Sequence, residues 1–252
     1  MLEILDQAFV ELHKFGGKPP SKLRVEDRLL LTLQYWREYR TLEHLAYEYD
    51  TVVSNIHKAI EWVENTLIQA GAFRLPGKKT LIVGEKNRKP SLLMCGTSYR
   101  TSKKKQEDWY SGKKKRHTIK TMIVIDLHTL EILFIVQAEG SVHDFTMYKD
   151  STGSAVSSDV KVKVDSGFQG IAAFHANSEV PFKKSKNRPL TKEEKAFNRR
   201  LVRERIAIEH VNREIKVFKI MSDRYRNRRR RHGLRMNLIC AIRNSEINHS
   251  KG

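Results

Sequence analysis

Asp165 is the residue whose type and position most directly suggest chemistry. Residues 160–164 alternate valine with lysine, which is the period of a strand, and Asp165 follows where the alternation stops. In an open α/β sheet, ligands and metals gather at the carboxyl ends of strands, because the next loop leaves the sheet there. A carboxylate at this place is suited to binding a metal ion. The plainer alternative is an Asp that initiates a turn before Gly167.

Two basic clusters flank an aromatic pair earlier in the chain. The clusters and the aromatic residue between them are Lys103, Lys104 and Lys105, then Trp109, then Lys113, Lys114, Lys115 and Arg116. Lysine and arginine neutralise phosphates, and an aromatic ring offers a face on which a base or sugar can stack. The segment therefore predicts contact with nucleic acid. The alternative is a solvated surface loop.

The composition favours the same partner. The 252 residues hold 48 Lys and Arg against 29 Asp and Glu, a net charge of +19, so the surface repels itself unless a polyanion neutralises it. An anionic membrane is the weaker alternative, because no apolar run approaches about 18 residues. Cys95 and Cys240 lie apart and form no zinc or disulfide pattern, and the acidic start of the chain does not resemble a signal peptide. We expect a folded protein of the cytoplasm, associated with the nucleoid.

The first 76 residues predict a helical DNA-binding region. Apolar residues recur at helical spacing in residues 2–15, 25–40 and 51–67, and Thr41 is a suitable cap for a short helix through Tyr47. The last three of these helices have the arrangement of a helix-turn-helix. Short polar and basic residues occupy the exposed side of the helix of residues 51–67, near its start, where a recognition helix meets base edges: Ser54, Asn55, His57 and Lys58. An ordinary three-helix bundle with a solvated face is the alternative.

From residue 77 onward the pattern becomes that of strands and then of a long helix. Strands are predicted at residues 91–95, 119–127 and 131–138, followed by a helix with Ser141 as its cap and by the strand that ends at Asp165. Thr191 and Glu194 form a capping box, so a long helix begins there and runs to about residue 220. Residues 224–235, which include Arg228 and Arg229, are mostly arginine and predict either a phosphate clamp or a disordered basic arm.

These pieces, in this order, resemble a bacterial DDE-type insertion-sequence transposase of the "insertion sequence five" group. The resemblance extends over nearly the whole chain. It is carried by the helix-turn-helix of residues 29–67, residues 109–118 (Trp-Tyr-Ser-Gly-Lys-Lys-Lys-Arg-His-Thr), residues 143–145 (His-Asp-Phe), residues 164–170 (Val-Asp-Ser-Gly-Phe-Gln-Gly) and residues 203–210 from Arg-Glu-Arg-Ile to Glu-His.

The resemblance implies an α/β fold: a ribonuclease-H-like core of mixed sheet and flanking helices, residues 77–252, preceded by the all-helical region of residues 1–76. Such enzymes hold divalent Mg²⁺ or Mn²⁺ with three acids, one on the first strand, one after the fourth strand and a Glu on the late helix. Asp165 matches the second acid and Glu209 the third, with Arg205 and Lys216 as the basic residues that bracket Glu209. From the helix alone, the favoured interpretation of Glu209 is the plainer one, an i,i+4 partner of Arg205. The implied partner is double-stranded DNA, both element ends and target, bound by a homodimer.

The first acid is where the chain departs from this pattern. Residues 92–102 contain no carboxylate, although the family places an Asp at the end of this strand and a Pro-Ile-Glu-Arg-Pro-like turn after it. We hypothesise a frameshift: with suitable codons, residues 98–102 reread in another frame as Pro-Ile-Glu-Arg-Pro, and residues 91–95 as Val-Val-Asp-Val, which places the lost Asp across Leu93 and Met94. The gene sequence decides this.

Two functions follow from the departure. One is a transposase that binds terminal inverted repeats and cleaves and transfers strands, impaired by loss of the first acid. The other is a non-enzymatic DNA-binding remnant that represses or inhibits intact copies. Robust cleavage by the unmodified chain would mean that another acid, with Asp126 or Asp144 the first to test, has taken the missing role.

Overall fold

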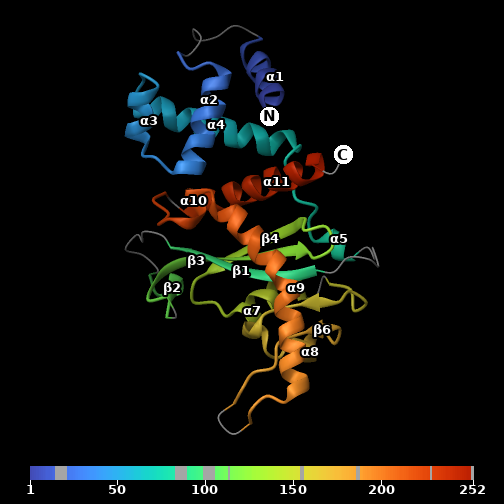
Figure 1. The fold of residues 1–252 in the computed structure, drawn as a ribbon. Coiled ribbons are helices and arrows are strands. Elements are labelled where there is room, and N and C mark those ends of the chain that lie inside the picture. The colour runs from blue at the N-terminus through green and yellow to red at the C-terminus, as the bar shows by residue number, and fades with distance from the viewer. Residues whose placement is uncertain are drawn as a thin grey trace.

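The computed structural model describes residues 1–14, 22–82, 90–98, 106–112, 114–153, 156–185, 188–227 and 229–250. Its helical region holds α1 (Leu2–His13), α2 (Val25–Glu38), α3 (Leu42–Glu48) and α4 (Val53–Ala70). Figure 1 shows these four helices as one layer above the sheet. Each matches a helix predicted from periodicity, so the helical region is confirmed.

Local signals explain where these helices begin and end. The Thr41 hydroxyl accepts a hydrogen bond from the backbone N–H of His44 at 3.2 Å, which caps α3 as predicted. Gly71 ends α4 with φ of +72°, a conformation that glycine adopts without strain. One face of α4 buries Ile56, Ile60 and Val63. Packing of that face against α2 and α3 stabilises the region.

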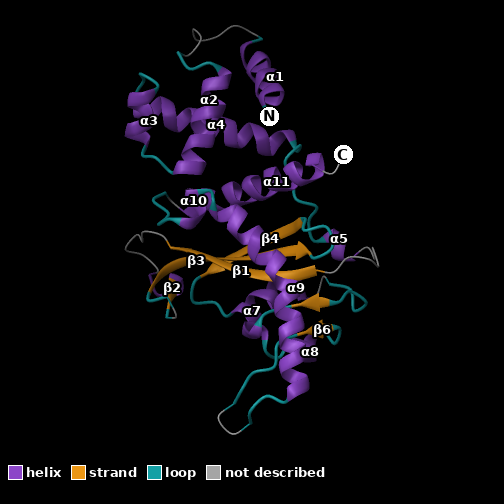
Figure 2. Ribbon diagram, viewed as in Figure 1, coloured by secondary structure: helices purple, strands orange, loops and turns teal. Residues whose placement is uncertain are grey.

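The remainder is built on a sheet whose strands are β1 (Pro90–Ser98), β2 (Tyr110–Ser111), β3 (Arg116–Asp126), β4 (Ile132–Glu139), β5 (Val162–Lys163) and β6 (Ser178–Glu179). β4, β3 and β1 are joined in antiparallel pairs, and β5 and β6 continue from β1 in parallel, while β2 pairs with the start of β3. Figure 2 shows the strands in orange with helices on both sides. This mixed sheet is the ribonuclease-H-like core that the resemblance implies.

Both faces of the sheet are covered, which accounts for the nearly continuous burial of β3. Ile123 and Ile125 belong to one apolar cluster with α9 (Lys192–Lys216) and α11 (His232–Ser250), whereas Met122 and Val124 belong to a second cluster with α7 (Asp144–Tyr148) and α8 (Ile171–Phe174). α11 lies between α4 and β4 (Figure 1). Because the first cluster also contains Leu31 and Leu67, the helical region and the sheet share a core.

Several predicted boundaries move. The capping box of Thr191 and Glu194 starts α9 as predicted, but the helix ends at Lys216, and a separate short α10 (Lys219–Ser222) follows. The cap of α7 is His143 and not Ser141, whose hydroxyl donates to the Asp108 carbonyl. The strand before Asp165 is only two residues long, because Val160 and Lys161 lie outside the pairing. The division at residue 76 stays a prediction.

The shorter elements complete the chain: α5 (Lys79–Ile82), α6 (Gln106–Trp109), a π-helical turn η1 (Lys149–Gly153), and the 3-10 turns η2 (Ser166–Phe168) and η3 (Arg229–Arg231). Among the described residues, none of the helices combines the length and the apolar character needed to cross a membrane.

Candidate active site

Asp165 follows β5 directly and caps the 3-10 turn η2. Its Oδ1 atom accepts a hydrogen bond from the backbone N–H of Gly167, and its side chain is half-buried. The Oδ2 atom has no hydrogen bond within the described part of the chain. The turn-initiating and ligand-binding interpretations of Asp165 are therefore compatible, because one oxygen holds the turn and the other stays available.

Asp144 is the acid that the fold brings next to Asp165. A Cβ atom on Gly167 would lie 2.9 Å from both Asp144 Oδ2 and Asp165 Oδ1, so the two carboxylates flank this glycine. The Nζ atom of Lys120 on β3 lies 2.8 Å from Asp144 Oδ1 and offsets part of the negative charge. Sequence reasoning named Asp144 as a possible substitute acid, but nothing in the sequence indicated Lys120.

Glu209 lies on the exposed side of α9. Its Oε2 atom accepts a long hydrogen bond of 3.5 Å from the Asn212 amide, and the described residues show no ion pair between Glu209 and Arg205. The i,i+4 alternative for Glu209 is therefore not supported. Arg205 is half-buried, and its Nε atom is buried without a hydrogen-bond partner. Lys216, at the end of the same helix, is exposed.

A buried lysine connects the strand of Asp165 to the helix of Glu209. Lys163 on β5 is 8% exposed and forms an ion pair with Glu204 of α9, and Glu179 on β6 lies 3.6 Å away. Lys163 is buried because α9 covers that side of the strand. Because a buried lysine needs a carboxylate partner, this contact fixes α9 against β5 two residues before Asp165 and five before Glu209.

The donor set suits a hard cation without forming a closed cage. Carboxylate oxygens are the ligands that Mg²⁺ prefers, and Mg²⁺ keeps several of its waters. Within the residues that the structure describes, no three His, Cys, Asp or Glu side chains come together as a metal group. Asp126, the other substitute acid considered, is buried and accepts from the backbone N–H of His128 at 3.0 Å. Among the described residues, the Asp144–Asp165 pair is thus the position at which a further acid would complete a metal site.

The predicted recognition residues are exposed at the start of α4. Ser54, Asn55, His57 and Lys58 all reach solvent, while Ile56 between them is fully buried. His57 Nδ1 lies 3.5 Å from Glu61 Oε2, and Asn55 donates to the Thr51 hydroxyl at 3.0 Å. These contacts are local, so the side chains remain accessible to a groove of DNA.

The basic loop is described only in part. Lys103, Lys104, Lys105, Lys113 and Arg228 lie outside the described residues, as do residues 99–102 of the proposed frameshift. Lys114 and Lys115 are exposed in the turn between β2 and β3, and Arg116 is exposed at the start of β3. Trp109 is half-buried, with the guanidinium of Arg229 4.0 Å from its ring centroid. That cation already occupies one face of the ring proposed for base stacking.

The arginine-rich stretch is tied to the helical region. Arg231 and Arg235 each donate through Nε to the fully buried Glu64 on α4 at 2.6 Å, and Trp36 donates to the same carboxylate at 3.1 Å. Arg226 donates to the backbone carbonyls of Tyr39 and Arg40, the two residues that follow α2. We call Arg226, Arg231 and Arg235 the arginine clasp. The disordered-arm interpretation is wrong, and these three arginines bind protein groups.

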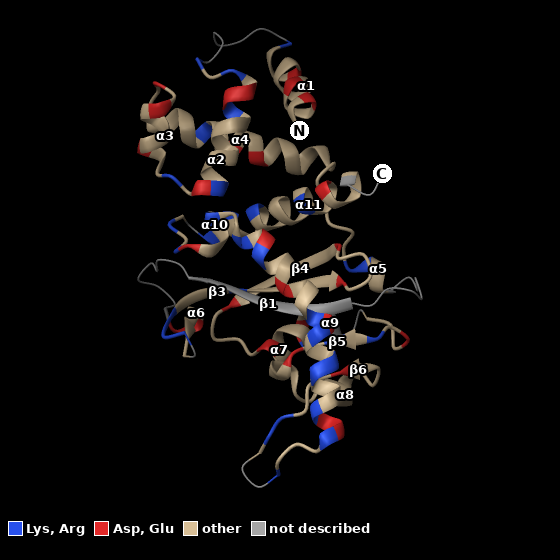
Figure 3. Ribbon diagram, viewed as in Figure 1, with Lys and Arg blue, Asp and Glu red and all other residues tan. Residues whose placement is uncertain are grey.

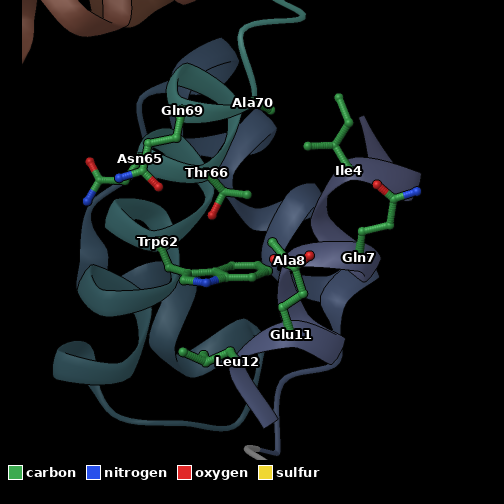
Figure 4. Close-up of a pocket in the computed structure, with 10 residues that line it drawn as sticks. All are labelled: Ile4, Gln7, Ala8, Glu11, Leu12, Trp62, Asn65, Thr66, Gln69 and Ala70. Carbon is green, nitrogen blue, oxygen red and sulfur yellow. The ribbon is translucent and has the colours of Figure 1, made fainter. Parts of the chain in front are cut away.

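A groove of about 650 Å³ lies between α1 and α4, with Trp62 near its centre (Figure 4). Its lining holds no basic residue and one acid, Glu11. It therefore has neither the charge for phosphate nor the ligands for a metal. Figure 3 instead shows Lys and Arg gathered along the N-terminal half of α9 and the loop that leads into it, below the sheet.

Two family models and a relative match most of the chain. Residues 21–73 match the family described as the helix-turn-helix of DDE superfamily endonuclease, and residues 96–244 match the DDE superfamily endonuclease family. The "Probable transposase for insertion sequence element IS702" of Microchaete diplosiphon is 40% identical over 248 residues, which cover 98% of this chain and 89% of that protein. A crystal structure of a pre-cleavage Mos1 transpososome covers 93% of this chain and 79% of its own at 11% identity, with a TM-score of 0.24.

Proposed function

This chain belongs to the DDE superfamily of endonucleases found in insertion-sequence transposases, and on that premise we propose that Asp165 and Glu209 are two acids of a metal-dependent strand-cleavage site. The protein would bind the inverted repeats of its element through α4, as a homodimer on double-stranded DNA within the nucleoid of the cytoplasm. A bound Mg²⁺ or Mn²⁺ would supply Lewis-acid chemistry for the attacking and leaving oxygens of an in-line displacement.

The register of the sheet is the observation that carries this proposal. β1 and β5 are parallel, with Ser91 paired to Lys163. If that register is continued two residues past the end of β5, Leu93 falls opposite Asp165. A first-strand acid at that position would therefore reach the neighbourhood of Asp165, and the Lys163–Glu204 ion pair keeps the helix of Glu209 against the same strand.

The residues of the chain have separate roles in this proposal. Asp165 would hold the cation through Oδ2, the oxygen that Gly167 leaves available, and Glu209 would complete the site from α9. Asp144 contributes negative charge beside Asp165 while Lys120 limits the repulsion between the two carboxylates. Exposed lysines and arginines, among them Lys216 and Arg116, hold the phosphates of the DNA.

The strand without an acid favours the second function. β1 is a complete strand from Pro90 to Ser98, yet it carries no carboxylate. Removing one electrostatic contributor from a preorganised site commonly costs about 10²- to 10³-fold in rate. The chain would then bind element ends and cleave them feebly, acting as a DNA-binding remnant that competes with intact copies.

One experiment tests both functions. Cleavage of an end-containing duplex is followed with Mn²⁺ or Mg²⁺ for the natural chain, for Leu93→Asp, and for Leu93→Asp combined with Asp165→Asn or Glu209→Gln. We expect weak cleavage by the natural chain, at least 10²-fold more with Leu93→Asp, and loss of that gain in both combinations. Asp159→Asn, which removes an exposed acid before β5, is the matched control and should change little. No gain from Leu93→Asp, with DNA binding intact, would reject the Leu93 position; strong cleavage by the natural chain would reject the impaired site.

A further inference from the structure

An aromatic groove opens beside the loop that follows Asp165. Its volume is about 360 Å³, and its lining runs from Gln169 and Gly170 to the segment of residues 178–183 and to Phe197 on α9. Gln169 is four residues beyond Asp165, so the groove begins within about 14 Å of that residue, given the reach of about 3.3–3.6 Å per residue. A nucleic acid strand at Asp165 would pass this groove within a few nucleotides, because each strand of a duplex carries one phosphate per about 3.4 Å of helix axis.

Phe182 presents an exposed aromatic ring in this groove. The side chain is 48% exposed, and its ring centroid lies 5.3 Å from that of Phe197, at an angle of 67°. Single exposed apolar residues are common on folded proteins, so the exposure of Phe182 is informative only together with the groove around it. The packing on Phe197 leaves part of the Phe182 ring open to a further ring.

The backbone of Phe182 is held on two sides. The Asn198 amide on α9 accepts from the N–H of Phe182 at 2.9 Å and donates to its carbonyl at 3.0 Å. Gln169 donates to the neighbouring Pro181 carbonyl at 3.1 Å. The backbone that carries the ring is therefore fixed between α9 and the loop after Asp165. A ligand that stacks on the ring then needs to order only the side chain, which limits the entropy lost on binding.

Positive charge lies at the edge of the groove. Lys183 lines it and Lys184 follows in the chain, and both are exposed and form no ion pair among the described residues, while Arg200 on α9 pairs with Glu179 of the lining. Figure 3 shows this concentration of Lys and Arg along α9. Such charge favours an anionic ligand, and together with the aromatic ring it favours a nucleotide over an apolar peptide.

The one acid in the lining does not oppose an anion. Glu179 lies 3.3 Å from Arg200 and from Lys161, and 3.6 Å from Lys163. Burial alone would raise the pKa of the Glu179 carboxyl, but the hydrogen bond from Lys161 and the charges of Lys163 and Arg200 lower it below its ordinary value. Glu179 is thus ionised and compensated by three cations.

We propose that this groove binds one unpaired nucleotide of the DNA strand that is engaged at Asp165, with its base stacked on Phe182 and its phosphate near Lys183. The volume admits a base and its sugar but not a duplex, and a base can stack on a protein ring only after it leaves the helical stack. The proposal rests on the proposed function, because that function brings DNA to Asp165. It adds that the DNA there is locally unpaired.

The test compares two duplexes of one sequence, one fully paired and one with three unpaired nucleotides, by fluorescence anisotropy at fixed salt and without metal. We expect the natural chain to prefer the unpaired duplex. Phe182→Ala should reduce binding of the unpaired duplex by about 5- to 100-fold while binding of the paired duplex stays unchanged. Phe182→Trp should keep the preference. Phe174→Ala removes a ring that is 42% exposed on α8 and outside the groove, and serves as the matched control.

Each other outcome overturns the proposal. Equal preference in the natural chain and in Phe182→Ala would show that the ring contacts no base, and an equal loss on both duplexes would show that it only supports the fold. A change in sedimentation with Phe182→Ala, at constant DNA preference, would assign the groove to a second copy of the chain. Failure to bind either duplex would instead count against DNA binding itself, and absence of cleavage would not bear on this assay.

Discussion

Replacement of Glu64 by Gln tests whether the arginine clasp holds the helical region to the sheet. The Glu64 carboxylate is fully buried and receives hydrogen bonds from Trp36, Arg231 and Arg235. Burial acts to lower the pKa of the Arg235 guanidinium, but the charge of Glu64 raises it above its ordinary value, so Arg235 stays protonated. The Gln variant would leave a charged arginine that is 4% exposed without its anion.

Breaking a buried ion pair from one side costs about 3–5 kcal/mol, and for a chain of this size each kcal/mol shifts Tm by about 2–4 °C. We therefore expect Glu64→Gln to lower Tm by roughly 6–20 °C, measured by calorimetry and by urea unfolding followed through tryptophan fluorescence. Glu61→Gln, on the same helix, is the control. It also removes a carboxylate bound to Arg231, but its side chain is 39% exposed, so the cost should stay below about 1 kcal/mol.

A double change, Glu64→Met with Arg235→Met, should recover most of the loss, because a buried pair can be replaced by apolar side chains at little cost. The reasoning would be refuted if Glu64→Gln were no more harmful than Glu61→Gln. It would also be refuted if the double variant were less stable than Glu64→Gln, since the loss would then come from packing and not from an unpaired charge.

Three further changes have defined outcomes. Burial and the charge of Arg235 lower the pKa of His232 to about 4, so between about pH 6.5 and pH 4 the unfolded chain binds this proton and the folded chain does not. The free energy of unfolding, measured with urea, should therefore fall by about 2 kcal/mol between pH 7 and pH 5, and His232→Phe should remove that part of the fall. Gly167→Ala, in the chain restored by Leu93→Asp, should abolish cleavage yet keep DNA affinity, because its Cβ would displace the two carboxylates that flank it; unchanged cleavage would remove them from the site. Lys58→Ala should lower the slope of log affinity against log salt by about 1, whereas Asn55→Ala should reduce discrimination between end and random duplexes at an unchanged slope, both by titration at several salt concentrations.

Local features of the fold could be predicted because their causes lie within a few residues. Thr41 and Thr191 cap helices as the spacing of their neighbours indicates, and Asp165 follows a strand as the alternation indicates. The recognition residues could be placed on the exposed side of α4 because helical periodicity separates them from Ile56.

Features that depend on distant segments could not be predicted. The alternation of residues 160–164 indicates a strand but does not show that α9 returns to cover Lys163 with Glu204. The arginines of residues 224–235 suggest phosphate binding by composition, yet Arg231 and Arg235 meet an anion supplied by α4. Glu64 itself looks like an ordinary polar helix residue, and only the position of α11 between α4 and the sheet makes it buried.

The arginine clasp also bears on the order in which the protein matures on the ribosome. Glu64 and its partner Arg235 are separated by 171 residues, so at about 5–20 residues per second the carboxylate is translated roughly 10 to 30 s before its guanidinium. During that interval Glu64 stays open to water, because α11 is not yet there to cover it. The contact between the helical region and the sheet would thus be completed only after α11 has been synthesised.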